Sequence, residues 1–380
     1  MGTQGIGSIV VPRWISVETF MNNLTIGTPV ALRDIEKKLT SLWQESADKE
    51  AGKPVIRAST INFIVLSHHP DQVESINRVV SEISDHHPSR IIVALVDPDS
   101  SSADISARIS LQCNLNVAMN KQICFEQVVL ETGPGGFAKL SGIILPLLLP
   151  DLPVFLWMAD NQFELIDDLH PLHGAIDRLL IESSGMVDDW SAFQRYRKQL
   201  LDINERMGIS DLHWGYLTEW REALAQFFDQ PARQDWLENI REITLLHKSG
   251  GASIDGLFLV AWMASRLGWT LNSVSDREKL LIKFTSAKQK VDVRFDNQGN
   301  RPLDRVVIHS DDKERSMHFT AEFKDDHIVM EVRQGEKIIE SGMVAAPSDE
   351  LGALVCHELD LLKNDRIYLA MLNILENHND

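Results

Sequence analysis

Short apolar runs alternate with amphipathic stretches through the first half of the chain. The runs 61–67 (INFIVLS) and 90–97 (RIIVALVD) are apolar at nearly every position and too short for typical helices, which predicts strands buried on both faces. Similar runs lie at 122–132, 154–160 and 177–184, and helical spacing is found at 29–46, 71–85 and 137–149. Because strands of this kind alternate with helices, the pattern predicts an α/β fold whose N-terminal part is a mostly parallel sheet with flanking helices.

The pattern becomes helical from about residue 188 to residue 270. Trp220, Leu224 and Phe227 repeat at helical spacing, and the same spacing is read for Trp236, Ile240 and Ile243. The stretch 256–269 is apolar nearly all round, which predicts a helix enclosed by protein, with Gly268 as its stop.

After residue 280 the apolar period becomes two. Val291, Val293 and Phe295 alternate with polar residues, and the same alternation runs through 316–323. We therefore expect a C-terminal α+β part with an antiparallel sheet over 271–345, joined by turns such as 296–299 and 310–313. A final helix is expected over 347–376, with Ser348 as its N-cap.

The length of 380 residues predicts two domains rather than a single core. We expect an N-terminal extension over 1–28, an α/β domain over 29–187 and a C-terminal domain over 188–380.

The charge balance is strongly acidic. Lys and Arg number 37 against 55 Asp and Glu, a net charge of −18, with a sequence pI near 5.1. Such a surface repels phosphate backbones and anionic lipids, so neither nucleic acid nor membrane is expected as a partner. The apolar stretch 140–159 reaches membrane-spanning length but contains three prolines and Asp151, which predicts buried elements instead.

The cysteines and the N-terminal residues favour a cytoplasmic location. The chain has three cysteines and no C-x-x-C pair, so no zinc site is expected, and a reducing compartment fits. The first residues lack a charged segment followed by a long apolar one, so we expect no secretory signal. Histidine doublets at 68–69 and 86–87 are poor bidentate ligands, and no metal site is predicted.

One turn could bind an anion. Gly133–Gly136 follows a predicted strand and precedes a predicted helix, where backbone N–H groups can meet a phosphate, and Lys139 lies one turn further on. The turn matches no phosphate-loop motif, and a plain strand-to-helix connection explains its glycines better. The anion-binding candidates are Arg57, Arg90, Gly135, Gly136 and Lys139; for Arg57 and Arg90 an internal ion pair with Asp151 or Asp160 explains the residues at least as well.

No nucleophile motif or acid–base pair with recognisable spacing occurs in the sequence, so no catalytic residue is assigned. Nine tryptophans are many for this length, and most have core spacing. Any tryptophan that is exposed would mark an interaction surface. The tryptophans that core spacing explains least well are Trp157, Trp190, Trp214 and Trp269.

Four motifs in one order carry a family resemblance: residues 87–90 (HPSR), 146–157 (PLLLPDLPVFLW), 211–214 (DLHW) with Trp220-Arg221, and 264–269 (ASRLGW). The run 146–157 is the most specific. In these motifs the chain resembles the OpcA family of glucose-6-phosphate dehydrogenase assembly proteins, from about residue 29 to the end of the helical segment.

The resemblance implies a non-enzymatic role without a cofactor. Family members bind glucose-6-phosphate dehydrogenase, favour its active oligomer and raise its substrate affinity in the oxidative pentose phosphate pathway. An exposed face at Pro150, Asp151, Trp157, Asp211 and Trp214 is the expected partner surface, with buried strand ends as the alternative.

Cyanobacterial members of the family are associated with redox control, which makes Cys113 and Cys124 redox candidates. A bridge between them would close a short loop, but two unpaired thiols are the expectation. The rival hypothesis for the whole protein is an α/β enzyme that binds a sugar phosphate or nucleotide at Gly133–Gly136.

Overall fold

The computed structural model describes residues 27–49, 55–57, 59–69, 72–116, 121–160, 162–184, 189–248, 253–276, 279–312, 315–361 and 365–376. The expected N-terminal extension over 1–28 lies almost entirely outside these residues. The chain divides into two compact units, the first made of 1–160 with 165–172 and the second of 161–164 with 173–380. The boundary expected at 187 stays a prediction.

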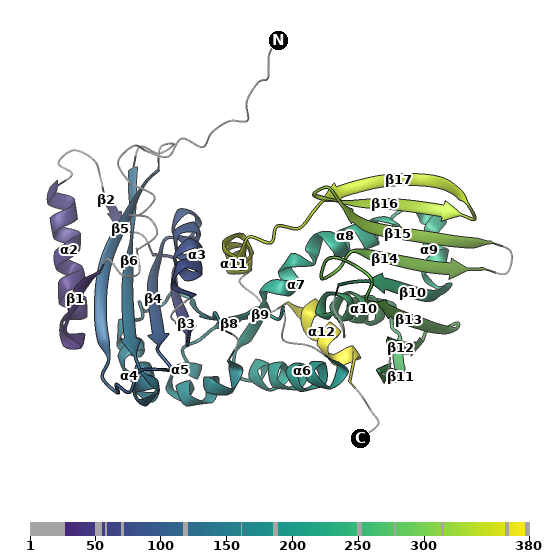
Figure 1. The fold of residues 1–380 in the computed structure, drawn as a ribbon. Helices are drawn as coiled ribbons and strands as arrows, with labels where there is room; N and C mark the ends of the chain where they lie inside the picture. Colours follow the sequence, from purple (N-terminus) through teal and green to yellow (C-terminus); the bar gives the residue numbers. More distant parts are fainter. Residues whose placement is uncertain are drawn as a thin grey trace, which may run out of the picture. The chain divides into compact units, whose positions relative to one another are not determined.

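The first unit contains a mostly parallel sheet with the strand order β1-β5-β6-β4-β3-β7 and β2 beside β6 (Figure 1). Its strands are β1 (Thr28–Val30), β2 (Val55–Arg57), β3 (Ile61–Ser67), β4 (Ser89–Val96), β5 (Ser106–Asn116), β6 (Lys121–Thr132) and β7 (Val154–Met158). Strands β3, β4, β6 and β7 are parallel, and every residue of β3, β4 and β7 is buried. The prediction of an α/β fold with strands buried on both faces is confirmed.

Three strands of this sheet were not predicted: β1, β2 and β5. Strand β5 pairs antiparallel with β6, and β1 pairs antiparallel with β5 in the stretch read as the start of a helix. Pro29 lies in this edge strand, where its missing N–H costs little, and helix α2 begins only at Ile35.

The helices of the first unit include α2 (Ile35–Lys49), which lies beside β5, and α3 (Val73–His86), which connects β3 to β4 (Figure 1). The helix expected over 137–149 is broken into η3 (Pro134–Lys139), α4 (Leu140–Ile144) and η4 (Leu145–Leu147). Pro146 lies in η4, and a proline cannot continue an α-helical hydrogen-bond ladder.

The second unit contains an eight-stranded sheet with the order β11-β12-β13-β10-β14-β15-β16-β17 (Figure 1). Its strands are β10 (Ile240–Leu246), β11 (Thr270–Asp276), β12 (Leu280–Thr285), β13 (Lys290–Asp296), β14 (Arg305–Asp311), β15 (Ser316–Lys324), β16 (His327–Gln334) and β17 (Lys337–Ala345). Strands β14 and β15 pair as an antiparallel hairpin, as expected, but Ser310 and Asp311 of the turn expected at 310–313 belong to β14, and Lys313 lies outside the described residues.

Strand β10 corrects two predictions. Ile240 and Ile243 were assigned to a helix, but they lie in β10, which is inserted between β13 and β14. The turn at 296–299 therefore does not join two neighbouring strands. Spacing of three or four residues occurs by chance in a short strand, and only the sheet neighbours resolve the ambiguity.

The remaining elements of the second unit begin with β8 (Arg178–Ile181) and β9 (Gly208–Asp211), a parallel pair. Its helices are α6 (Trp190–Asn204), α7 (Leu212–Tyr216), α8 (Thr218–Gln226), α9 (Pro231–Leu237), α10 (Ile254–Leu267), α11 (Leu351–Asp360) and α12 (Arg366–Ile374). Gly268 ends α10 in the left-handed conformation at φ 64°, as predicted. The single helix expected over 347–376 is two helices, and Glu350 rather than Ser348 precedes α11.

Candidate functional site

The family motifs place most of their polar and aromatic residues inside the protein. Trp157, Asp211 and Trp214 are 2%, 1% and 3% exposed, so the exposed face expected at these three residues does not exist. Pro150 and Asp151 are exposed, and Asp151 adopts a left-handed backbone at φ 63°. Trp190 and Trp269 are buried as well, which makes both of them core residues rather than markers of a surface.

Asp211 is the centre of a buried polar cluster in the second unit. It ends β9 and caps α7, where its Oδ1 accepts hydrogen bonds from the backbone N–H of His213 and the hydroxyl of Ser183, each at 3.0 Å. Its Oδ2 accepts from the hydroxyls of Tyr196 on α6 and Tyr368 on α12, each at 3.0 Å. Burial raises the pKa of Asp211, while the hydrogen bonds and the positive charge of His213 oppose that shift. The Asp211 carboxylate thereby connects the end of β9 and the residues just after β8 with the helices α6, α7 and α12.

His213 extends the cluster towards the surface. Its Nε2 pairs with Oδ1 of Asp255 on α10, its Nδ1 lies 3.6 Å from Glu182, and its ring stacks on Tyr216. Burial would lower the pKa of His213, but Asp255, Asp211 and Glu182 together raise it to about 9. At neutral pH the ring is therefore an imidazolium held by carboxylates.

Trp214, the other aromatic residue of the motif, organises the N-terminus of α12. Its Nε1 donates to Oδ2 of Asp365 at 2.7 Å, and Oδ1 of Asp365 caps α12 by accepting from the backbone N–H of Ile367 and Tyr368. The Arg221 guanidinium lies 3.6 Å from the Trp214 ring centroid and donates to the carbonyl of Trp214. The motif residues 211–214 and 220–221 thus lie inside the second unit, where Trp214 holds the residue that caps α12.

Two exposed apolar residues lie near that helix start in the sequence: Leu361, which follows α11, and Ile367, in the first turn of α12. Leu361 is 38% exposed and Ile367 is 42% exposed. We define the candidate functional site as this frame, centred on Asp211, His213 and Trp214, together with exposed Leu361 and Ile367.

Sequence reasoning found the motif but missed its partners. All three tyrosines of the chain belong to the cluster, two on Asp211 and one on His213. The scarcity of tyrosine was the available signal, since a rare amphipathic residue is placed where its hydroxyl has a use. Nothing in the sequence pointed to Asp255, which lies in a nearly all-apolar helix.

Arg90 of the anion-binding candidates is deeply buried in the first unit. Its guanidinium donates to Glu126 at 2.7 Å, to Glu36 on α2 at 2.5 Å and to the carbonyl of Leu147 at 2.6 Å. The ion pair considered with Asp151 or Asp160 is therefore made with two glutamates instead. Arg57 ends β2, which pairs with β6.

The glycine turn packs against the loop that precedes β5. A Cβ on Gly133 would lie 2.5 Å from the carbonyl oxygens of Ser100 and Ser102, and one on Gly135 would lie 3.1 Å from Ala103. The N–H groups of Gly133 and Gly136 donate to carbonyls within the protein, and Lys139 Nζ donates to the Ala103 carbonyl at 3.0 Å. The structure thus brings Gly135, Gly136 and Lys139 together but not with Arg90.

The carboxyl end of β3 is where doubly wound folds bind ligands, between the strands at which the sheet order reverses. Here His68 follows β3, and its backbone N–H and Nδ1 both reach Oδ2 of Asp160, at 2.5 and 2.8 Å. The Phe137 ring lies 5.2 Å from the His68 ring. The side chains of His68, Asp160 and Phe137 lie at this position. Dinucleotide-binding folds have glycines there, which let the pyrophosphate approach the backbone.

Cys124 forms a disulfide, so the expectation of an unpaired thiol is wrong for this residue. Strand register places the backbone of Cys113 directly opposite Cys124. Cys356 is buried and forms no disulfide.

The described part of the chain contains neither a membrane-spanning helix nor a metal-binding cluster. No helix among those residues is both long and apolar enough to cross a membrane. The same residues contain no group of three or more His, Cys, Asp or Glu side chains arranged to hold a metal ion.

Comparison with known proteins gave two family models in chain order. Residues 80–198 match the glucose-6-phosphate dehydrogenase subunit N-terminal domain, and residues 207–372 match the C-terminal domain of the same subunit. The "Putative OxPP cycle protein OpcA" of Synechocystis is 24% identical over 328 residues, covering 65% of this chain and 66% of that protein. The protein of the same name from Synechococcus elongatus is 25% identical over 309 residues, covering 64% of this chain and 68% of that protein.

Two solved structures with a partly similar fold are described as oxidoreductases. A putative oxidoreductase from Parabacteroides merdae has a TM-score of 0.47 at 10% identity, and the aldose-aldose oxidoreductase from Caulobacter crescentus has 0.46 at 10%. Each likeness covers 83% of this chain and 96% of the other. At such scores the likeness carries no functional argument.

The fold and site define a two-unit α/β protein whose motif residues form a buried frame. By the match of both its domains, the chain belongs to the OpcA family of glucose-6-phosphate dehydrogenase assembly proteins.

Proposed function

We propose that this protein is a non-catalytic assembly factor of glucose-6-phosphate dehydrogenase that binds the enzyme, favours its active oligomer and raises its substrate affinity. The observation that carries the proposal is the match of both domains, in order, to the two domains of a glucose-6-phosphate dehydrogenase subunit family. We propose that this activity is cytoplasmic, the location expected from the sequence.

The site geometry supports a binding role over a catalytic one. The carboxylate of Asp211 is saturated by internal donors, and His213 is held as an imidazolium by Asp255. A group with its proton acceptors already occupied is a poor general base, whereas a rigid frame that fixes exposed apolar side chains suits a protein interface.

The proposed contact surface is the α12 start with Leu361 and Ile367; Pro150 and Asp151 remain predicted contacts. The protein needs only to bind the competent oligomer better than the incompetent one, and a coupling of about 1–3 kcal/mol changes affinity roughly 5–150-fold.

The test mixes the purified protein with its cognate dehydrogenase and measures apparent KM and oligomer size. We expect a lower KM and a larger share of the active oligomer, and no turnover of sugar phosphates by this protein alone. Ile367→Glu should weaken both effects, while Leu32→Glu, an equally exposed apolar position in the first unit, should not. An unchanged KM and oligomer size with the unmodified protein would refute the proposal.

A further inference from the structure

Strand β17 is one edge of the eight-stranded sheet. It pairs only with β16, so the hydrogen-bonding groups of its other edge have no strand partner among the described residues. Eight of its nine residues are exposed, and they include three large apolar side chains: Ile338 at 46%, Ile339 at 44% and Met343 at 68%. Natural edge strands are usually blunted by prolines, charged side chains, β-bulges or cover. β17 has no proline; its charged residues are Lys337 and Glu340 and its β-bulge lies between Ile338 and Glu340, so the stretch 341–345 carries none of the first three protections.

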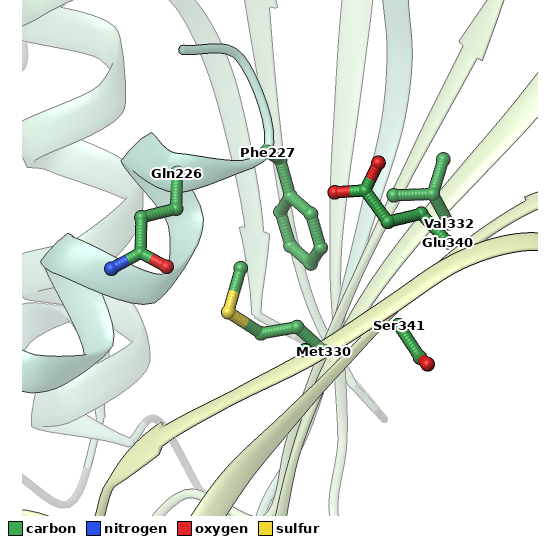
Figure 2. A pocket seen from close by; sticks show the side chains of 7 residues that line it. Gln226, Phe227, Met330, Val332, Glu340 and Ser341 are labelled. Atoms are coloured by element: carbon green, nitrogen blue, oxygen red, sulfur yellow. The ribbon is translucent and has the colours of Figure 1, made fainter. Parts of the chain in front are cut away.

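The inner face of β17 does not rest on a filled core. A hollow lies between the end of α8 and the strands β16 and β17, lined by Gln226, Phe227, Met330, Val332, Glu340, Ser341 and Gly342 (Figure 2). Glu340, one of the residues that line the hollow, forms an ion pair with Arg233 on α9, and this interaction lowers the pKa of Glu340. The strand is thus held by β16 and a few contacts to α8 and α9, and it presents its free edge outwards.

We propose that β17 pairs with β17 of a second copy of this chain, antiparallel, around a two-fold axis at Ser341. Residues directly opposite each other in antiparallel strands have side chains on the same face, so the axis must pass through a residue rather than between two. With the axis at Ser341, Ile339 faces Met343 of the second copy, Glu340 faces Gly342, and Ser341 faces its own counterpart.

This register is favoured by the side chains themselves. It gives apolar partners to Ile339 and Met343, the exposed pair nearest the axis, and places small Gly342 opposite each Glu340. Moving the axis to Glu340 would set two carboxylates opposite each other, which is destabilising. Moving it to Gly342 would shorten the overlap and leave Ile338 without a counterpart.

The ends of the strand limit the pairing. A β-bulge at Ile339 closes one end, since Val332 and Arg333 of β16 pair with Glu340 and Ile338, and Pro347 follows the other end. The paired stretch is therefore short, and edge pairing of this size predicts a dimer with a dissociation constant on the order of micromolar. An isologous contact of this kind closes after two copies and does not form a fibre.

The first experiment measures oligomeric state by sedimentation velocity up to about 100 µM protein, a concentration above the expected dissociation constant. We expect a dimer whose dissociation constant rises at least about tenfold in Ile339→Lys and in Met343→Lys, because a lysine on an edge strand opposes edge-to-edge pairing. Leu32→Lys, the same change at an exposed apolar position of the first unit, should leave dimerisation unchanged.

The second experiment tests the register by oxidation with oxidised glutathione. Ser341→Cys should form a disulfide-linked dimer, because the axis brings this residue to its own counterpart. Ser275→Cys, an exposed serine on the opposite edge strand β11, should remain monomeric on a denaturing gel.

Three results would overturn the inference: a monomer throughout, a dimer that persists in both lysine variants, or no more crosslinking at Ser341 than at Ser275. A monomer whose edge variants lose binding to the dehydrogenase would assign the edge to that partner and equally overturn pairing between copies. Because dimerisation is measured without the dehydrogenase, its failure leaves the proposed function untouched.

Discussion

Tyr368 donates its hydroxyl hydrogen to Oδ2 of Asp211 over 3.0 Å, and this bond joins residues 157 positions apart. Both partners are almost completely buried, and Tyr196 donates to the same oxygen. The last helix of the chain is thereby fixed to the first motif of its family's C-terminal domain.

Removal of either hydroxyl should destabilise the second unit. Tyr368→Phe and Tyr196→Phe should each lower the free energy of unfolding by about 1–3 kcal/mol, because a buried carboxylate loses a donor that water cannot replace. Urea denaturation measures the change. Tyr216→Phe is the control, since its hydroxyl makes no hydrogen bond within the described residues, and an equal loss there would contradict the prediction.

His213 should make stability depend on pH. Its pKa in the folded protein, about 9, exceeds the ordinary value of 6.5, so its contribution is fully present below pH 6.5 and is lost as the pH rises through 9. The full contribution is about 3 kcal/mol, from a shift of that size at about 1.4 kcal/mol per pKa unit. Unfolding measured from pH 6 to 9.5 should show the decline in the parent protein and a flatter profile in His213→Gln. Identical slopes in the two proteins would contradict this.

The Arg90–Glu126 pair should be critical to the first unit. Glu126→Gln removes one charge from a pair whose members are 2% and 1% exposed, and breaking such a pair costs about 3–5 kcal/mol. Hydrogen exchange in peptides from β4 and β6 should report the loss as reduced protection. Glu36→Gln is the matched control: its side chain is 51% exposed, so an effect within about 1 kcal/mol is expected. A comparable loss in both variants would show that burial does not set the effect.

Two glycine substitutions should have opposite signs. A Cβ on Gly256 would lie 2.7 Å from the Phe295 ring and 3.3 Å from Leu245, so Gly256→Ala should push α10 off the sheet and cost about 1–3 kcal/mol. A Cβ on Gly142 meets nothing within 4 Å, so Gly142→Ala in α4 should be neutral or stabilise by up to about 1 kcal/mol. Thermal unfolding of both variants decides, and a stabilising Gly256→Ala would contradict the close packing.

The sequence by itself determined the elements whose burial is uniform. Strands β3, β4 and β7 are apolar at most positions and buried at all of them, and the stretch of α10 is apolar nearly all round, because each is enclosed by protein and needs no solvent-facing polar side. Alternation of period two likewise identified β13 and β15, since one face of their sheet is buried and the other is not. The family motifs were also legible, because they are contiguous.

The tertiary structure decided what depends on neighbours distant in sequence. Strand β10 lies between two strands that follow it in the chain, and its register was invisible to local spacing. The motif residues Asp211 and Trp214 were expected on a surface, but their polar atoms find partners on helices far along the chain and are therefore buried. Burial of a polar group depends on whether the fold supplies a hydrogen-bond partner, and only the assembled structure provides that partner.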